Sequence, residues 1–250
     1  MKKFLKENWK FLLLVLFGGL LGGYCAGVYG YDSLSEELLK QIQEQNVTKE
    51  MLGLSSMIQY GILYGVILAS IGIVISKKIN LWKSFKLDKK AIFATIIITI
   101  ISALVIFPGD KLIFEPLNNW ISEQYMVKPT IYKMITGLLV GGIIEEVMMR
   151  LFFMSLVVFV ISKILKKKEI PTIVFIIGNF LAALLFAAGH LPSTAAMTAL
   201  TPVIIFRCLL FNGGLGMAFG YLYRKYNIRY AMLSHGLAHL IADILMLIFI

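Results

Sequence analysis

Residues 130–162 read TIYKMITGLLVGGIIEEVMMRLFFMSLVVFVIS. About 20 mainly apolar residues cross the ~30 Å hydrocarbon core of a bilayer, so this run is long enough to span a membrane. Near its middle it nevertheless carries two adjacent glutamates and an arginine. One acidic residue at the centre of a membrane helix costs about 2.5–3.5 kcal/mol on insertion scales. The stretch therefore predicts a membrane helix that contains a polar site.

The composition of the whole chain agrees with a membrane protein. Of 250 residues, 59% are hydrophobic and 15% charged, and the mean hydropathy is +0.83, whereas ordinary soluble domains are about 45–50% apolar. Two long apolar regions, 130–162 and 195–222, contain charge, proline or glycine pairs and can be tilted, broken or split. We expect an all-α polytopic membrane protein of six to eight transmembrane helices, forming a single membrane domain over residues 1–250. The apolar regions are 10–30, 56–76, 91–107, 130–162, 171–189, 195–222 and 229–250.

The distribution of basic residues predicts the orientation. Seventeen of the 24 lysines and arginines lie at the N-terminus and in 77–90, 163–169 and 224–229, which alternate with the other loops. By the positive-inside rule this side, with the N-terminus, is cytoplasmic. Topology thus explains the net charge of +10, and we expect no nucleic-acid partner because no soluble basic domain is present. We interpret the N-terminal segment as an uncleaved first span, since no small-x-small cleavage site follows it.

On a helix, the two glutamates face different neighbours. Glu146 and Arg150 are four residues apart with the acid first, the favoured geometry for an ion pair. Glu145 lies about 100° around the helix from Glu146, so it need not share that pair. A carboxylate left free in such a site suits a general base.

All three histidines follow the glutamates and lie in apolar segments. His190 has Phe186 four residues before it, placed to pack on its ring. His235 and His239 share one helical face, a spacing by which two imidazoles can address one metal ion or one substrate group. Asp243, a further turn along, is predicted to orient His239. A membrane histidine often serves only as a hydrogen-bond partner between helices, but the joint pattern favours a polar reaction centre.

These residues resemble a known family. Glu145-Glu146-x-x-x-Arg150, Phe186-x-x-x-His190 and His235-x-x-x-His239 look like the three motifs of the CAAX protease and bacteriocin-processing (CPBP, or Abi) family of intramembrane endopeptidases. The segment before the last motif, with Gly216 and Gly220 spaced for close helix packing, is also similar. The resemblance covers roughly residues 130–245 and makes 130–250 a catalytic core after N-terminal helices in 1–129.

The resemblance implies a role for each motif residue. Glu145 would activate water, while His190 and His235 would help to bind or polarise the peptide carbonyl, and Glu146 and Arg150 complete the first motif. The family's last motif commonly ends in Asn, and here that position is His239, whose N–H can still donate to an oxyanion. His190, His235 and His239 are equally the candidate ligands of a zinc ion, so the mechanism is either a zinc or a metal-free glutamate one.

The expected function is hydrolysis of a peptide bond in a small hydrophobic or membrane-associated peptide or protein precursor. A bacterial plasma membrane is favoured by the short loops and the lysine- and isoleucine-rich composition. Two alternatives stay open, namely a non-catalytic bacteriocin-immunity or regulatory protein and a proton-coupled transporter. Neither the substrate nor the oligomeric state follows from the sequence.

One estimate conflicts with a simple bundle. Counting ~1.5 Å per residue from the predicted cytoplasmic ends puts His235 ~9 Å deep and His190 ~28 Å deep. Helices that cross the membrane perpendicularly, with their ends at the same depth, cannot bring these two side chains together. The sequence therefore predicts a broken or shifted helix, or a wrong boundary.

Overall fold

The computed structural model describes residues 2–166 and 169–250, and every regular element in these two ranges is helical. Within them, seven helices are long and apolar enough to cross a membrane. This confirms the all-α class and the six to eight predicted spans, and both long regions form single spans. The spans are Lys2–Asp32, Lys49–Lys78, Lys89–Leu117, Ile131–Leu165, Thr172–Ala195, Pro202–Lys225 and Ile228–Phe249.

Three spans are single α-helices, α1 (Lys2–Asp32), α10 (Thr172–Ala195) and α13 (Ile228–Phe249). The other four contain wider π-helical turns, in which the backbone bond reaches five residues instead of four. They run through α3 (Lys49–Ile58), η1 (Gln59–Ile67) and α4 (Leu68–Lys78); α5 (Lys89–Leu104), η2 (Val105–Gly109), α6 (Asp110–Ile113) and the 3₁₀ turn η3 (Glu115–Leu117); α8 (Ile131–Ile135), η4 (Thr136–Glu145), η5 (Val147–Met154) and α9 (Ser155–Leu165); and α11 (Pro202–Cys208), η6 (Leu209–Gly214) and α12 (Leu215–Lys225).

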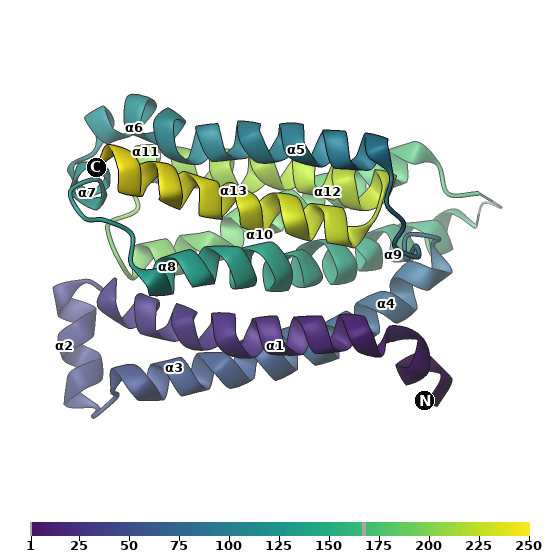
Figure 1. The fold of residues 1–250 in the computed structure, drawn as a ribbon, viewed down its shortest axis with the longest axis horizontal. Coiled ribbons are helices and arrows are strands. Elements are labelled where there is room, and N and C mark those ends of the chain that lie inside the picture. Colours follow the sequence, from purple (N-terminus) through teal and green to yellow (C-terminus); the bar gives the residue numbers. More distant parts are fainter. Residues whose placement is uncertain (1, 167–168) are drawn as a thin grey trace.

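Two short helices, α2 (Glu36–Glu44) and α7 (Asn119–Gln124), lie at the end of the bundle opposite the N-terminus (Figure 1). The capping residue of α2 is Ser35, whose side chain accepts from the backbone N–H of Leu38. Ser33, which follows α1 directly, donates to the carbonyl of Tyr29. Its hydroxyl therefore satisfies a carbonyl at the end of α1 and does not cap α2.

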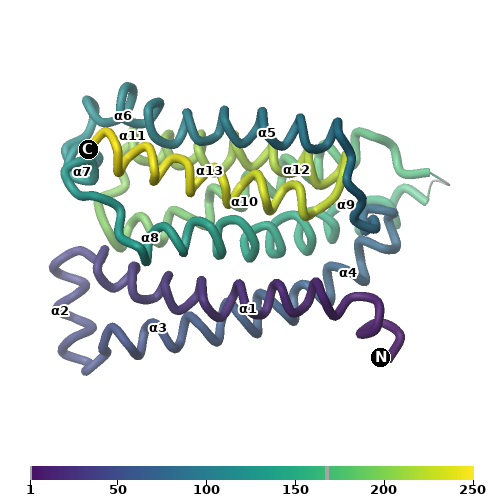
Figure 2. Tube along the Cα trace, viewed as in Figure 1, coloured from purple at the N-terminus to yellow at the C-terminus, as the bar shows by residue number. Residues whose placement is uncertain are grey.

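The bundle is arranged around the fourth span. α1 packs on α3, η1 and η4, while α13 packs on η4, α5 and α12. The tube in Figure 2 shows the N-terminus, the α4–α5 connection and the α12–α13 turn at one end of the molecule. The fourth span, which carries the glutamates, therefore lies between the N-terminal helices and α13.

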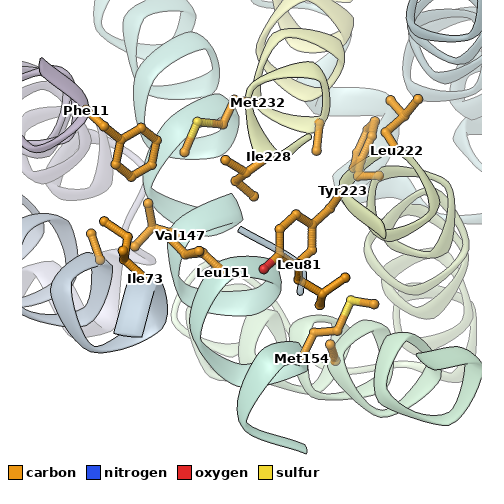
Figure 3. Close-up of a cluster of buried hydrophobic side chains, with 14 of the residues drawn as sticks. Phe11, Ile73, Leu81, Val147, Leu151, Met154, Leu222, Tyr223, Ile228 and Met232 are labelled. Carbon is orange, nitrogen blue, oxygen red and sulfur yellow. The ribbon is translucent and has the colours of Figure 1, made fainter. Parts of the chain in front are cut away.

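A hydrophobic core occupies the half of the bundle that contains the N-terminus. Figure 3 shows part of it, where Val147 and Leu151 of the fourth span meet Phe11, Ile73 and other buried side chains. Leu151 is fully buried, and truncation of such a side chain to Ala typically costs about 2–5 kcal/mol. Large apolar side chains on the outer faces are exposed, among them Phe17, Phe93 and Ile96, as expected for surfaces that face lipid.

Staggered helices resolve the conflict in depth. His190 lies about 27 Å along α10 from Thr172, and His235 lies about 10 Å along α13 from Ile228. Figure 1 shows that, at the end of the bundle that contains the N-terminus, α9 and the start of α10 extend farther out than the start of α13. The ends of α10 and α13 lie at different depths. His190 and His235 therefore come close together although neither helix is broken.

Candidate active site

The two glutamates lie where two π-helical segments meet. Glu145 ends η4 and Glu146 precedes η5, and the backbone of Glu146 keeps helical φ and ψ of −68° and −35°. Such wide turns are frequent at functional sites. Here they place the side chain of Glu146 in the core, fully buried, while that of Glu145 is 22% exposed.

Glu146 and Arg150 form the predicted ion pair, with Oε1 and Nη1 3.4 Å apart and both side chains fully buried. Nη2 of Arg150 donates to the carbonyl of Gly216 at 2.9 Å, and the guanidinium lies 4.9 Å from the centroid of the Phe186 ring. Gly216 thus gives the arginine access to the backbone of α12, since a Cβ there would lie 2.7 Å from Nη2. Arg150 thus links the first motif to α10, through the ring of Phe186, and to α12, through the carbonyl of Gly216.

The structure gives Glu146 a second partner that the sequence analysis missed. Its Oε1 accepts a hydrogen bond from Nδ1 of His235 at 2.9 Å. The two residues are 89 positions apart, and no local spacing signals such a pair. Glu146 is therefore both the partner of Arg150 and the residue that orients His235.

Glu145 faces the other side, toward the histidines. Its Oε1 lies 3.6 Å from Nε2 of His190 and its Oε2 lies 3.9 Å from Nε2 of His235. His239 joins them through a 3.2 Å contact between its Nε2 and that of His235. The six polar residues of the three motifs are thus brought into one connected cluster from the fourth span, α10 and α13.

The hydrogen bonds decide which ring nitrogens carry protons. Nδ1 of His190 lies 2.8 Å from the carbonyl oxygen of Phe186, which can only accept, so this nitrogen is protonated. The carboxylate of Glu146 also can only accept, so Nδ1 of His235 is protonated as well. In a neutral His235, Nε2 is then an acceptor, and the Nε2–H of His239 donates to it. In a neutral His190, Nε2 is likewise an acceptor that faces the carboxylate of Glu145, and two acceptors side by side require a shared donor such as water.

Aromatic rings hold two of the imidazoles in place. Phe186 packs edge-on against His190, with centroids 4.6 Å apart, as its position four residues earlier predicts. Phe219 of α12 stacks on His235 at 4.4 Å with the rings 16° apart. Each histidine therefore has a fixed ring plane as well as a fixed Nδ1 partner.

The predicted role of Asp243 is wrong. Its carboxylate forms an ion pair with Lys133 of α8, with Oδ1 and Nζ 3.1 Å apart, and makes no hydrogen bond to His239 among the described residues. The tertiary structure brings Lys133 from another span to the buried acid, and a charged partner offsets the cost of burial better than a neutral ring does.

The three histidines line a cavity with a volume of about 340 Å³, within the range of ordinary ligand sites. Its wall also contains a second polar cluster that the sequence analysis did not predict. Arg207 donates twice to the buried carboxylate of Asp110, both times at 2.6 Å, and the hydroxyl of Tyr125 donates to the same group at 2.7 Å. Burial and the nearby charge of Asp110 raise the pKa of Tyr125, so this hydroxyl remains a donor.

Imidazole and carboxylate groups are the ligands that zinc prefers, but their arrangement here is not that of a metal site. Across residues 2–166 and 169–250, no group of three or more His, Cys, Asp or Glu side chains converges so as to hold an ion. The Nε2 atoms of His235 and His239 contact each other directly. The zinc alternative stays a prediction.

A family model described as type II CAAX prenyl endopeptidase Rce1-like matches residues 127–241. The matched segment contains all three motifs and confirms the resemblance to CAAX proteases. No curated protein and no solved structure matches the chain.

Proposed function

We propose, from the match of residues 127–241 to the Rce1-like endopeptidases, that this chain is an intramembrane protease that hydrolyses a peptide bond within the bilayer. The observation that supports it best is the position of Glu145, whose carboxylate faces His190 and His235 beside a cavity between helices. A partly accessible carboxylate that faces two histidines of a cavity wall can act on a bound substrate and on water.

In the proposed reaction, a water molecule donates one hydrogen to Glu145 and the other to Nε2 of His190. The carboxylate of Glu145 and the unprotonated Nε2 of His190 are both acceptors. A water molecule that donates both hydrogens to them keeps a lone pair free to attack. The water oxygen forms a bond with the carbonyl carbon while Glu145 takes the proton. The carbonyl π electrons move to oxygen and produce a tetrahedral oxyanion.

We assign stabilisation of this oxyanion to the Nε2–H of His239, which turns from Nε2 of His235 to the oxyanion, while Glu146 holds His235 beside it. Removal of one such donor typically lowers kcat about 10²–10³-fold. When the intermediate collapses, the C–N bond breaks and the departing nitrogen takes the proton from Glu145. The products are a carboxylic acid and an amine, and Glu145 regains its charge.

The proposed substrate is a short segment of a small hydrophobic or membrane-associated peptide or protein precursor. The cavity wall presents Tyr29, Trp120, Met197 and Phe211, apolar surfaces that suit such side chains. The charges of Arg207 and Lys133 are already paired with Asp110 and Asp243, so the wall has no free strong charge to attract a highly ionic substrate.

The test is cleavage of a fluorogenic peptide library by the purified full chain, with Glu145→Gln compared with Glu37→Gln on the exposed helix α2. We expect Glu145→Gln to lower kcat by about 10²–10⁴-fold, the usual contribution of a general base, and Glu37→Gln to leave it unchanged. A parallel series with a chelator separates the zinc and metal-free mechanisms. Absence of cleavage by folded wild type across lipids and peptides would favour the immunity or regulatory role.

A further inference from the structure

A second cavity, of about 510 Å³, lies at the end of the bundle that contains the N-terminus. The start of α1, the end of α4, the connection 79–88 and the start of α13 form its walls, and Figures 1 and 2 show these segments together at that end. It shares no lining residue with the cavity at the histidines. The proposed protease mechanism does not use it.

The walls of this cavity are strongly basic. They contain Lys6, Lys10, Lys77, Lys83 and Arg229, against the single acid Glu7. Glu7 pairs with Lys77 at 2.9 Å. In the part of the chain that the structure describes, no carboxylate forms an ion pair with the other four cations. The cavity therefore carries a positive charge that no carboxylate of residues 2–166 or 169–250 neutralises.

Arg229 is held as an anion-binding group would be. Its guanidinium lies 5.2 Å from the ring centroid of Phe11, 5.8 Å from that of Trp82 and 5.6 Å from that of Phe85. Rings against a guanidinium fix its plane but leave its N–H groups available to acceptors. Among the described residues, the guanidinium of Arg229 makes no hydrogen bond, and its backbone N–H donates to Oδ1 of Asn227.

Lys83 adds a second fixed cation. Its Nζ donates to the carbonyls of Arg224 and Lys225, at 2.9 and 3.0 Å, where α12 ends. Burial, and then the positive charges of Lys225 and Arg224, lower the pKa of Lys83. A bound anion would offset the positive charges of Lys225 and Arg224 beside this ammonium group.

The surroundings point to a lipid as the source of that anion. Trp9 is 50% exposed at the rim, and tryptophan is typical of the level of the lipid headgroups. Leu5, Trp9, Leu13 and Phe17 are all exposed and follow one another at four-residue intervals along α1, which places them on one face. This stripe runs from the cavity along the span, where an acyl chain would lie.

We propose that this cavity binds the phosphate-bearing headgroup of an anionic phospholipid, with Arg229, Lys10, Lys6 and Lys83 around the phosphate and the acyl chain on the apolar stripe of α1. A zwitterionic headgroup fits less well, because its choline would lie among four unpaired cations. Basic pockets between membrane helices are sites of this kind. The proposal is independent of the proposed protease activity.

The experiment is native mass spectrometry of the full chain in a non-ionic detergent with equal amounts of phosphatidylglycerol and phosphatidylcholine. We expect one phosphatidylglycerol to be retained in preference. Arg229→Gln should weaken its binding about fivefold, the effect of one cation at a membrane surface, and Arg229→Gln with Lys10→Gln by more than tenfold. Lys86→Gln, at the same end but outside the cavity, is the matched control and should bind as wild type does.

Three results would overturn the proposal. They are equal retention of both lipids, equal loss in Arg229→Gln and Lys86→Gln, or displacement of phosphatidylglycerol by millimolar glycerol phosphate as readily as by more lipid. The last result would identify a site for a soluble phosphate. If Arg229→Gln fails to fold, the exposed pair Lys6→Gln and Lys10→Gln carries the same test, because neither side chain packs in the core.

Discussion

At the scale of single residues, Glu146 and Arg150 show why two charges can remain in a membrane core. Both side chains are fully buried, and each has partners besides the other, His235 for the acid and the carbonyl of Gly216 for the arginine. Glu146 Oε2 and Arg150 Nε and Nη1 nevertheless have no hydrogen-bond partner among the described residues. The pair therefore adds little net stability, while loss of either member leaves a buried charge uncompensated.

This balance leads to a prediction for the pair. Arg150→Leu should lower the free energy of unfolding by about 3–5 kcal/mol, because the charge of Glu146 then lacks its partner. Adding Glu146→Gln should recover part of that loss, since no full charge remains buried. Denaturant unfolding in detergent measures both variants, and a double variant less stable than Arg150→Leu would contradict the argument.

His239 allows a test of the departure from the family motif. An Asn at this position also presents an N–H donor to an oxyanion, so His239→Asn should keep kcat within about tenfold of wild type. His239→Leu removes the donor and should lower kcat about 10²–10³-fold. Peptide cleavage measures both, and equal activity of the Leu and Asn variants would remove His239 from the mechanism.

At the scale of elements, the site depends on how closely α13 approaches η4. A Cβ at Gly142 would lie 2.7 Å from Cα of Gly236, and a Cβ at Gly236 would lie 2.8 Å from the carbonyl oxygen of Leu138. Two backbones can approach this closely only where side chains are missing. The contact places His235 against Glu146, so the glycines of η4 and α13 position the histidines although they perform no chemistry.

A larger side chain at this crossing should therefore separate the motifs. We expect Gly236→Val to lower both kcat and thermal stability, because α13 must move away from η4. Gly30→Ala is the control, since a Cβ at Gly30 meets nothing within 4 Å. Cleavage and thermal unfolding of both variants check the prediction, and an active Gly236→Val enzyme would show that the close approach is not needed.

At the scale of the whole molecule, charge and fold agree on which loops share a side. The N-terminus, the α4–α5 connection and the α12–α13 turn lie at one end (Figure 2), and α2 and α7 lie at the other (Figure 1). The positive-inside rule assigns the first end to the cytoplasm. The cavity lined by the three histidines includes Trp120 and Gln124 of α7, so it extends toward the opposite end.

Sidedness is directly measurable because the native thiols, Cys25 and Cys208, are buried. Lys86→Cys and Lys163→Cys should react with a membrane-impermeant maleimide only from the cytoplasmic side, and Glu123→Cys only from the other. A comparison of labelling in intact cells with labelling in inverted vesicles shows on which side of the membrane each cysteine lies. Reaction of Lys86→Cys and Glu123→Cys from one side would contradict the seven-span topology.

The sequence by itself determined the number and approximate limits of the spans, since a length of apolar residues suffices to cross a bilayer whatever its neighbours. It also determined the three motifs and the Glu146–Arg150 pair, because residues four apart on one helix meet regardless of the fold. Only the tertiary structure decided the pairing of Glu146 with His235, of Asp110 with Arg207 and of Asp243 with Lys133, because these partners come from other spans. It likewise decided the stagger of α10 against α13, because helix levels follow from packing between helices rather than from the length of any one of them.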